Sequence, residues 1–193
     1  MIDSMEPEIY SKIFLSQVPA RGLTFDEQVE DCLKSLKAKA QAAGSDLTNA
    51  LMLTFFVKAE KTSDYTQKKS QGLSILPQFF GSNIPATSFV AQNPEENILV
   101  SLDAILLPKI YGGRIHHKDC NGIRYTSVES PLFTEVYAAG LANHPNQTDP
   151  SAQYREAFES LKRVLRNEEM DFSHIVRQWN YIEGFLKISP RNG

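Results

Sequence analysis

An internal repeat constrains the fold of this 193-residue chain more than any other feature of its sequence. The stretch that begins at Glu27 aligns without a gap with the stretch that begins at Ala152, so that each residue meets the one 125 positions later. Ser35-Leu36-Lys37 meets Ser160-Leu161-Lys162, and the apolar pattern agrees throughout although identities are few. Self-similarity of this kind indicates two copies of one supersecondary unit.

In both copies the apolar residues predict one buried face of a helix. They follow the spacing i, i+3, i+4, i+7 and i+11, which places them on a single stripe. The first stripe is Val29, Cys32, Leu33, Leu36 and Ala40, and the second is Tyr154, Ala157, Phe158, Leu161 and Leu165. Thr24 and Asp26 indicate the start of the first helix and Gly44 its end.

Short runs rich in β-branched and aromatic residues predict strands around each helix. After a turn at Asp46 or Asp171, these runs are Ala50–Val57 and Ile175–Ile182. Before the helices they are Ile13–Ser16 in the first copy, and Gly122–Val128 and Val136–Gly140 in the second.

The first copy continues into further elements that the second copy lacks. Thr62–Phe80 predicts a second helix, capped by Thr62 or Ser63 and interrupted by Pro77, followed by a pair of strands at Pro85–Ala91 and Ile98–Leu107. We therefore expect a complete module at 1–108 and a partial one at 109–193, with an open sheet edge. A fragment of a longer protein is the favoured explanation, and completion by another chain is the alternative.

Composition excludes several classes of protein. Hydrophobic residues make up 41% and charged residues 22%, which is typical of a soluble globular protein. The net charge of −3 does not favour a nucleic-acid partner, and no apolar run is long enough for a membrane span. Two distant cysteines, Cys32 and Cys120, predict neither a disulfide framework nor a metal site, so we expect reduced thiols and a cytoplasmic protein.

Several short motifs, taken in order, resemble the RidA/YjgF family, also known as endoribonuclease L-PSP-like. Ser16-Gln17-Val18-Pro19 matches a Ser-Gly-Gln-Ile-Pro turn of the family, and Ala42-Ala43-Gly44-Ser45 ends the first helix. Phe79-Phe80 precedes Ile84-Pro85-Ala86, and Leu102-Asp103-Ala104-Ile105 falls on the last strand. The resemblance covers most of residues 10 to 107. In the second copy, Arg177-Gln178-Trp179-Asn180-Tyr181 is similar to a strand of tandem proteins related to chorismatases.

This resemblance implies an α+β fold of chorismate-mutase-like modules, each a mixed sheet packed against two helices. It further implies trimers or pseudo-trimers of modules, as homo-oligomers or within one chain, with ligand clefts between neighbouring modules. Family members hydrolyse enamines and imines derived from amino acids. No cofactor is implied, and the composition gives the ribonuclease name no support.

The resemblance also selects candidate site residues. The family's Pro-Ala-Arg-Ser motif, whose arginine holds a substrate carboxylate, reads Pro85-Ala86-Thr87-Ser88 here. Thr87 has no charge to pair with a carboxylate, and Asp103 stands where the family has a longer acid. The first module is therefore expected to be catalytically degenerate, although both residues are also ordinary strand residues.

The second module supplies the other candidates for ligand binding. Arg124 and Tyr125 lie on a strand where the family places ligand-facing residues, and Arg177, Trp179 and Asn180 lie on the predicted last strand. Arg177 and Trp179 would share a face, as a stacked pair or as part of a cleft. The adjacent His116 and His117 would point to opposite faces, so they, like His174, are expected at the surface rather than at a metal.

The resulting hypothesis is a RidA/YjgF-like protein whose parent acts as a hydrolase or lyase. Its substrate would be a small carboxylated metabolite, similar to chorismate or to an enamine or imine, held in a cleft between modules. The alternative is a module that binds a small molecule or serves in assembly without catalysis. The catalytic residues are not predicted.

Overall fold

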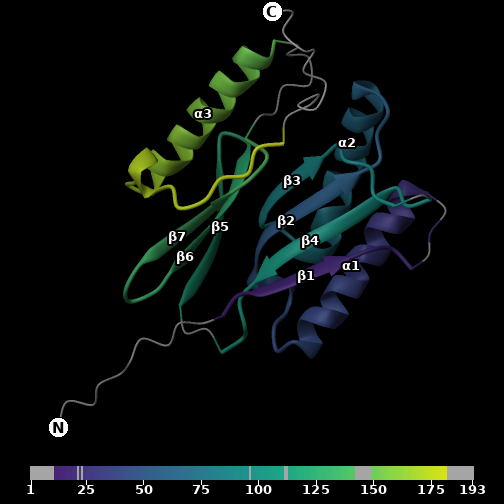
Figure 1. Ribbon diagram of the computed structural model, residues 1–193. Coiled ribbons are helices and arrows are strands. Elements are labelled where there is room, and N and C mark those ends of the chain that lie inside the picture. The colour runs from purple at the N-terminus through teal and green to yellow at the C-terminus, as the bar shows by residue number, and fades with distance from the viewer. Residues whose placement is uncertain are drawn as a thin grey trace, which may run out of the picture.

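The computed structural model describes residues 11–20, 22, 24–95, 97–110, 113–141 and 149–181, and its elements form four layers (Figure 1). Helices α1 and α2 cover one sheet, α3 covers a second sheet, and the two sheets face each other. The elements in chain order are β1 (Ile13–Gln17), α1 (Phe25–Ala42), η1 (Leu47–Asn49), β2 (Ala50–Val57), α2 (Thr62–Phe80), β3 (Ala86–Val90), β4 (Val100–Leu106), β5 (Arg114–Cys120), β6 (Ile123–Glu129), β7 (Thr134–Ala138), α3 (Pro150–Asn167) and η2 (Phe172–His174).

The first sheet has the strand order β1-β4-β2-β3. Strands β2 and β3 run parallel, whereas β4 is antiparallel to both β1 and β2. The predicted α+β module, a mixed sheet under two helices, is confirmed. The prediction that its last two strands form a pair is wrong, because β2 lies between β3 and β4. Strand β4 lies between β1 and β2, and its alternating apolar residues face the helix-covered core.

Helix α1 forms where the sequence predicts it. Thr24 caps it: the Thr24 hydroxyl accepts from Glu27 N at 3.3 Å, and Glu27 Oε2 accepts from Thr24 N at 2.9 Å. Gly44 follows the helix with a φ of 75°, a left-handed conformation that glycine adopts at little cost. All five residues of the predicted stripe are buried, so this prediction is confirmed.

Helix α2 differs from its prediction in two respects. It runs through Pro77 to Phe80 without a break, and Lys61 precedes it with no side-chain cap in place of the expected Thr62 or Ser63. Burial of Ile75, Leu76 and Phe80 in the core on both sides of the proline outweighs the one backbone hydrogen bond that proline cannot make. Gly72 lets the helix approach the sheet, because a Cβ there would lie 2.5 Å from a ring carbon of Phe89.

The second sheet is an antiparallel meander of β5, β6 and β7, with α3 packed over its outer face. The strand predicted at Gly122–Val128 is confirmed as β6, and the one predicted at Val136–Gly140 lies two residues earlier, as β7. The sequence does not predict β5, because its residues are mostly polar and show no alternation.

None of the described helices combines the length and apolar composition needed to cross a bilayer.

The repeat is reproduced in backbone detail. Helices α1 and α3 each have 18 residues and begin 125 positions apart. Each ends in the same hydrogen bond, from Ser45 N to Ala40 O in one copy and from Met170 N to Leu165 O in the other, both at 2.8 Å. In both copies the residue at the turn has a left-handed backbone conformation, with a φ of 75° at Gly44 and of 57° at Glu169.

The turn that follows each helix is also repeated, but the chain beyond it is not. Asp46 accepts from Thr48 N at 2.9 Å to start η1, and Asp171 accepts from Ser173 N at 2.8 Å to start η2. The prediction of a strand at Ile175–Ile182 is wrong over the described residues 175–181, which form none. Strand β2 is held between β3 and β4, whereas no described strand pairs with residues 175–181. Ile182 lies outside the described residues.

The second apolar stripe is only partly buried, which corrects another prediction. Phe158 is 43% exposed, whereas the equivalent Leu33 is 0% exposed. Tyr154 is likewise exposed, whereas its counterpart Val29 is buried. The neighbours differ: α1 packs against α2, β1 and β4, whereas α3 packs against β5 and β6.

Candidate functional site

The two sheets meet along a surface that we call the seam. Its apolar part joins residues that the chain separates widely: Leu51, Leu107 and Val128 are buried there, with Ile105, Ile115 and Tyr137 around them. Alternation along β5 and β6 sends every second side chain into the seam and the others toward α3. The seam is therefore the place where residues of both modules are brought together.

A chain of hydrogen bonds crosses the seam. Ala86 N donates to Thr126 Oγ1 at 3.1 Å, and Thr126 Oγ1 lies 3.3 Å from His117 Nδ1. His117 Nε2 lies 3.5 Å from Thr48 O, which can only accept, so the proton is assigned to Nε2 and the Thr126 hydroxyl donates to Nδ1. Burial lowers the pKa of His117, which favours this neutral form.

The position of His117 corrects the expectation that both histidines lie at the surface. Neighbouring residues of β5 do point to opposite faces, as predicted, but one of those faces is the seam. His117 is half-buried there, and His116 lies on the outer side, 3.5 Å from Glu129. His174 is exposed in η2, as expected.

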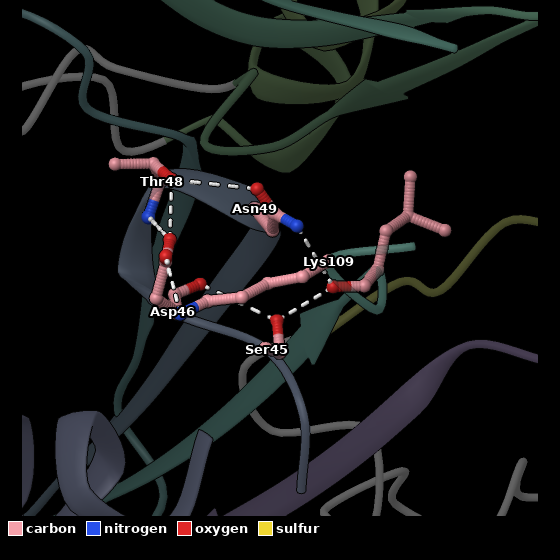
Figure 2. Close-up of polar contacts among 6 residues, drawn as sticks. Ser45, Asp46, Thr48, Asn49 and Lys109 are labelled. Atoms are coloured by element: carbon pink, nitrogen blue, oxygen red, sulfur yellow. Dashed lines mark hydrogen bonds and ion pairs between the residues drawn. The ribbon is translucent and has the colours of Figure 1, made fainter. Parts of the chain in front are cut away.

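Polar contacts hold the turn that carries Thr48 in place (Figure 2). Asp46 accepts from the Thr48 hydroxyl and backbone and lies 3.4 Å from Lys109 Nζ, and the hydrogen bonds from Thr48 lower the pKa of Asp46 most. Ser45 Oγ donates to Leu107 O at 2.5 Å. These contacts link the end of α1 to the chain after β4, so the carbonyl that meets His117 is rigidly placed.

Arg124 lies on the seam side of β6. The register of β5, β6 and β7 has no irregularity, so Arg124 faces the same way as Thr126 and Val128, which both contact the first module. Its side chain is half-buried and makes no hydrogen bond or ion pair with any residue that the structure describes. A guanidinium in this state keeps its capacity to bind a carboxylate in two parallel hydrogen bonds.

Thr87 lies on β3 beside the seam, but the strand register places its side chain on the same face as Leu53 and Phe89, which belong to the helix-covered core. Its hydroxyl donates to Pro85 O at 2.8 Å, and the preceding residue, Ala86, donates to Thr126. The loop after β7 passes close by, because a Cβ on Gly140 would lie 2.9 Å from Thr87 O. Gly140 also has a φ of 64°, so glycine is required there for both reasons.

Asp103 lies apart from these residues, on β4. Ser16 Oγ donates to it at 2.6 Å, and the strand register places it opposite Thr54 of β2. Ser88 of β3 donates to the Thr54 hydroxyl at 3.4 Å, so short polar side chains form a row across the sheet on the face away from the helices. The described residues of this row include no cation.

Tyr125 faces α3 rather than the seam. It is fully buried, its hydroxyl donates to Glu168 Oε1 at 2.6 Å, and Asn167 donates to the same hydroxyl. Burial and the contact with Glu168 raise the pKa of Tyr125 to about 12. Lys118 Nζ binds both oxygens of Glu168, at 2.9 and 3.0 Å. The Tyr125 hydroxyl therefore holds the end of α3 against β5 and β6.

The remaining candidates lie on the segment after η2. The Arg177 guanidinium lies 4.9 Å from the centre of the Trp179 ring, which is the stacked pair that the sequence allows. Trp179 is 54% exposed, and Asn180 accepts from Gln178 Nε2 at 2.8 Å. Tyr181, next in the chain, packs edge-on against Phe56 of β2 at 6.1 Å.

The structure thus brings Arg124 to the seam and places Thr87 beside it on the opposite face of β3, while the other five candidates lie elsewhere. Thr48, His117 and Thr126 are seam residues that sequence reasoning missed as site residues, since their meeting depends on how two sheets stack. Across the part of the chain that the structure describes, no group of three His, Cys, Asp or Glu side chains is placed to hold a metal. Cys32 and Cys120 are both free thiols.

Comparison with known proteins gave matches among solved structures only. No protein-family profile and no curated protein matched the chain in the sequence searches. A YjgF-family protein of Neisseria meningitidis is 22% identical with a TM-score of 0.43, covering 51% of this chain and 80% of that one. The Rid-family protein YyfA of Yersinia pestis is 21% identical with a TM-score of 0.44, covering 50% and 79%. Escherichia coli TdcF with bound serine is 18% identical with a TM-score of 0.45, covering 53% and 84%.

The chain is similar in fold to YjgF/Rid structures over about half its length. None of these three structures is described as a tandem or chorismatase-like protein.

Proposed function

We propose that this chain binds a small carboxylated metabolite at the seam, with Arg124 as the residue that holds the carboxylate. The observation that carries the proposal is the half-buried guanidinium on the seam side of β6, which no described residue neutralises. Arg124 stands two residues from Thr126, about 7 Å along the strand, and Thr126 is hydrogen-bonded to Ala86 of the Pro85–Ser88 motif. Arg124 is thus a cation of the second module that lies close to the motif in which Thr87 carries no charge.

The same geometry favours binding over catalysis. Thr87 cannot pair with a carboxylate, and Asp103 is engaged by Ser16 on another part of the sheet. We therefore propose that the first module is catalytically degenerate. Hydrolase or lyase activity on an enamine, an imine or a chorismate-like substrate remains the second candidate. One observation favours it: His117 lies in the seam in its neutral form, and a neutral imidazole has one ring nitrogen that can accept a proton.

Isothermal titration with pyruvate, 2-oxobutanoate and chorismate tests the binding proposal. At least one of them should bind saturably, and Arg124→Gln should weaken that binding by about 10- to 100-fold, the effect of losing a charged hydrogen bond. Arg114→Gln is the matched control, because Arg114 is exposed and points to the other side of the neighbouring strand β5. Equal loss in both variants, or no saturable binding by any of the three, would contradict the proposal.

A parallel assay separates binding from turnover. Release of pyruvate from chorismate, and of ammonia from an enamine generated in place, is expected to be no faster with the protein than without it. The hydrolase candidate would be favoured instead if the protein turned over one of these substrates and His117→Gln abolished the turnover but not the binding of the carboxylate.

A further inference from the structure

The hairpin of β5 and β6 carries one acidic and one basic side chain on its seam side, and they stand directly opposite each other. The register pairs Asp119 of β5 with Arg124 of β6, so both side chains leave the same face of the sheet. The structure describes both strands in full, and their other seam-side residues carry no charge: Ile115, neutral His117, Thr126 and Val128. The two charges therefore face only each other along this hairpin.

The turn of the hairpin brings these two side chains as close as a strand pair allows. Asn121 and Gly122 form the turn, with φ of 55° and 82°, the left-handed values typical of a two-residue hairpin. Such a turn closes on a hydrogen-bonded pair, so the next pair, Asp119 and Arg124, is of the closer kind without hydrogen bonds. Their β-carbons are therefore about 5 Å apart.

The rest of the protein leaves both charges available. Asp119 Oδ1 accepts from Gly122 N at 2.8 Å, so the turn holds this carboxylate in place. Neither Asp119 nor Arg124 forms an ion pair within the described part of the chain, whereas the seam-side acid of β7, Glu135, is paired with Lys12 at 2.8 Å. Arg124 is half-buried and Asp119 is exposed, so the pair lies where the seam opens to solvent.

An acid at this distance decides which carboxylates Arg124 holds well. A carboxylate that pairs with the guanidinium comes close to the charge of Asp119, and the two negative charges repel each other. A ligand that carries an ammonium group beside its carboxylate reverses the sign of this second interaction, because the ammonium group is attracted to Asp119. A zwitterion therefore complements both side chains, whereas a simple anion complements one and is repelled by the other.

We propose that the ligand of the seam is an α-amino acid, with Arg124 binding its carboxylate and Asp119 its ammonium group. The inference rests on the proposed function and names the class of carboxylated metabolite that the same site takes. In an α-amino acid a single carbon separates the two charged groups, which suits two side chains that leave directly opposed positions of a strand pair.

Two matched pairs of ligands test the inference: L-alanine against pyruvate, and L-2-aminobutanoate against 2-oxobutanoate. The members of a pair share the carbon chain and the carboxylate and differ only in the group on C2, which is an ammonium group or a carbonyl oxygen. Isothermal titration of the full chain at neutral pH and low salt should show each amino acid binding about tenfold tighter than its oxo acid, or more. The difference should narrow when salt is added.

Variants of the protein locate the two charges. Asp119→Asn should weaken binding of the amino acid about tenfold and leave the oxo acid unchanged or tighter, because the repulsion is removed. Asparagine keeps the oxygen that accepts from Gly122 N, so the turn is retained. Asp26→Asn, at an exposed position in the first turn of α1, is the matched control and should leave both affinities unchanged. Arg124→Gln should weaken both kinds of ligand.

The outcomes separate this inference from the proposed function. Oxo acids that bind as tightly as their amino acids, with both affinities lost in Arg124→Gln, would overturn the amino-acid ligand and leave the carboxylate site standing. A preference for the amino acid that survives in Asp119→Asn, or no saturable binding of either amino acid, would also overturn the inference. Binding of all four ligands that Arg124→Gln leaves unchanged would overturn the proposed function and the inference together.

Discussion

Helices α1 and α3 are built alike and surrounded differently. Both have 18 residues, both end in a left-handed turn closed by a 2.8 Å hydrogen bond, and both lead into an aspartate-capped 3₁₀ turn. The chain after the first becomes β2 between two strands, whereas residues 175–181 after the second form no strand. Local sequence therefore suffices for the helix and its turn, and neighbours from elsewhere in the chain decide whether the next segment becomes a strand.

The strongest test of this comparison replaces the equivalent residues Leu33 and Phe158. Leu33→Ala should destabilise the protein by about 3 kcal/mol, because it leaves a cavity in a closed core. Phe158→Ala should cost less than about 1 kcal/mol, because the ring is 43% exposed and little packing is lost. Urea denaturation of both variants gives the two values, and similar costs would show that the second stripe is covered after all.

An intermediate effect is expected at Glu168, which follows α3 where Ala43 follows α1. Glu168→Gln should cost about 2 kcal/mol, because Lys118 and Tyr125 lose a charged partner with little exposure. Glu159→Gln, on an exposed part of the same helix, should change stability by less than about 0.5 kcal/mol. Thermal or urea denaturation at neutral pH checks both values.

The pH dependence of the same contact has a definite sign. Burial opposes the charge on Glu168, but hydrogen bonds from Tyr125 and Lys118 outweigh it and lower its pKa from 4.5. The stabilisation is therefore complete above pH 4.5 and is lost as pH falls through the lowered pKa. The difference in stability between the protein and Glu168→Gln should shrink over that range; a difference that grows on acidification would contradict the assignment.

The smallest expected effects concern the left-handed residue at the end of each helix. Glu169→Gly should stabilise the protein by about 1 kcal/mol, because its φ of 57° is strained for a residue with a side chain. Gly44→Ala should destabilise by a similar amount, and only through strain, since a Cβ there would meet no atom within 4 Å. Thermal denaturation of the two variants should show shifts of opposite sign, and shifts of the same sign would break the equivalence of the two turns.

Most of the first module could be predicted from the sequence. The Thr24 cap, the stripe from Val29 to Ala40 and the stop at Gly44 depend on residues within a turn or two of one another, so the local pattern carries them. The prediction failed at Pro77, where buried neighbours on both sides sustain the helix, and at β5, whose polar residues give no periodic signal. The candidate site was harder still. Arg124 could be named from the sequence, whereas the contact between Thr126 and Ala86 joins residues that are 40 positions apart.

The sequence by itself determined that the chain contains two copies of one helix–turn unit, because caps, turns and apolar spacing act over a few residues. Tertiary structure alone decided which stripe is buried, which segment becomes a strand and which polar groups meet at the seam. A strand exists only when another strand takes up its backbone hydrogen bonds, and an apolar stripe is buried only when another element covers it. Both conditions depend on distant parts of the chain. Equivalent local sequences therefore differ in burial and in strand formation between the two halves of this protein.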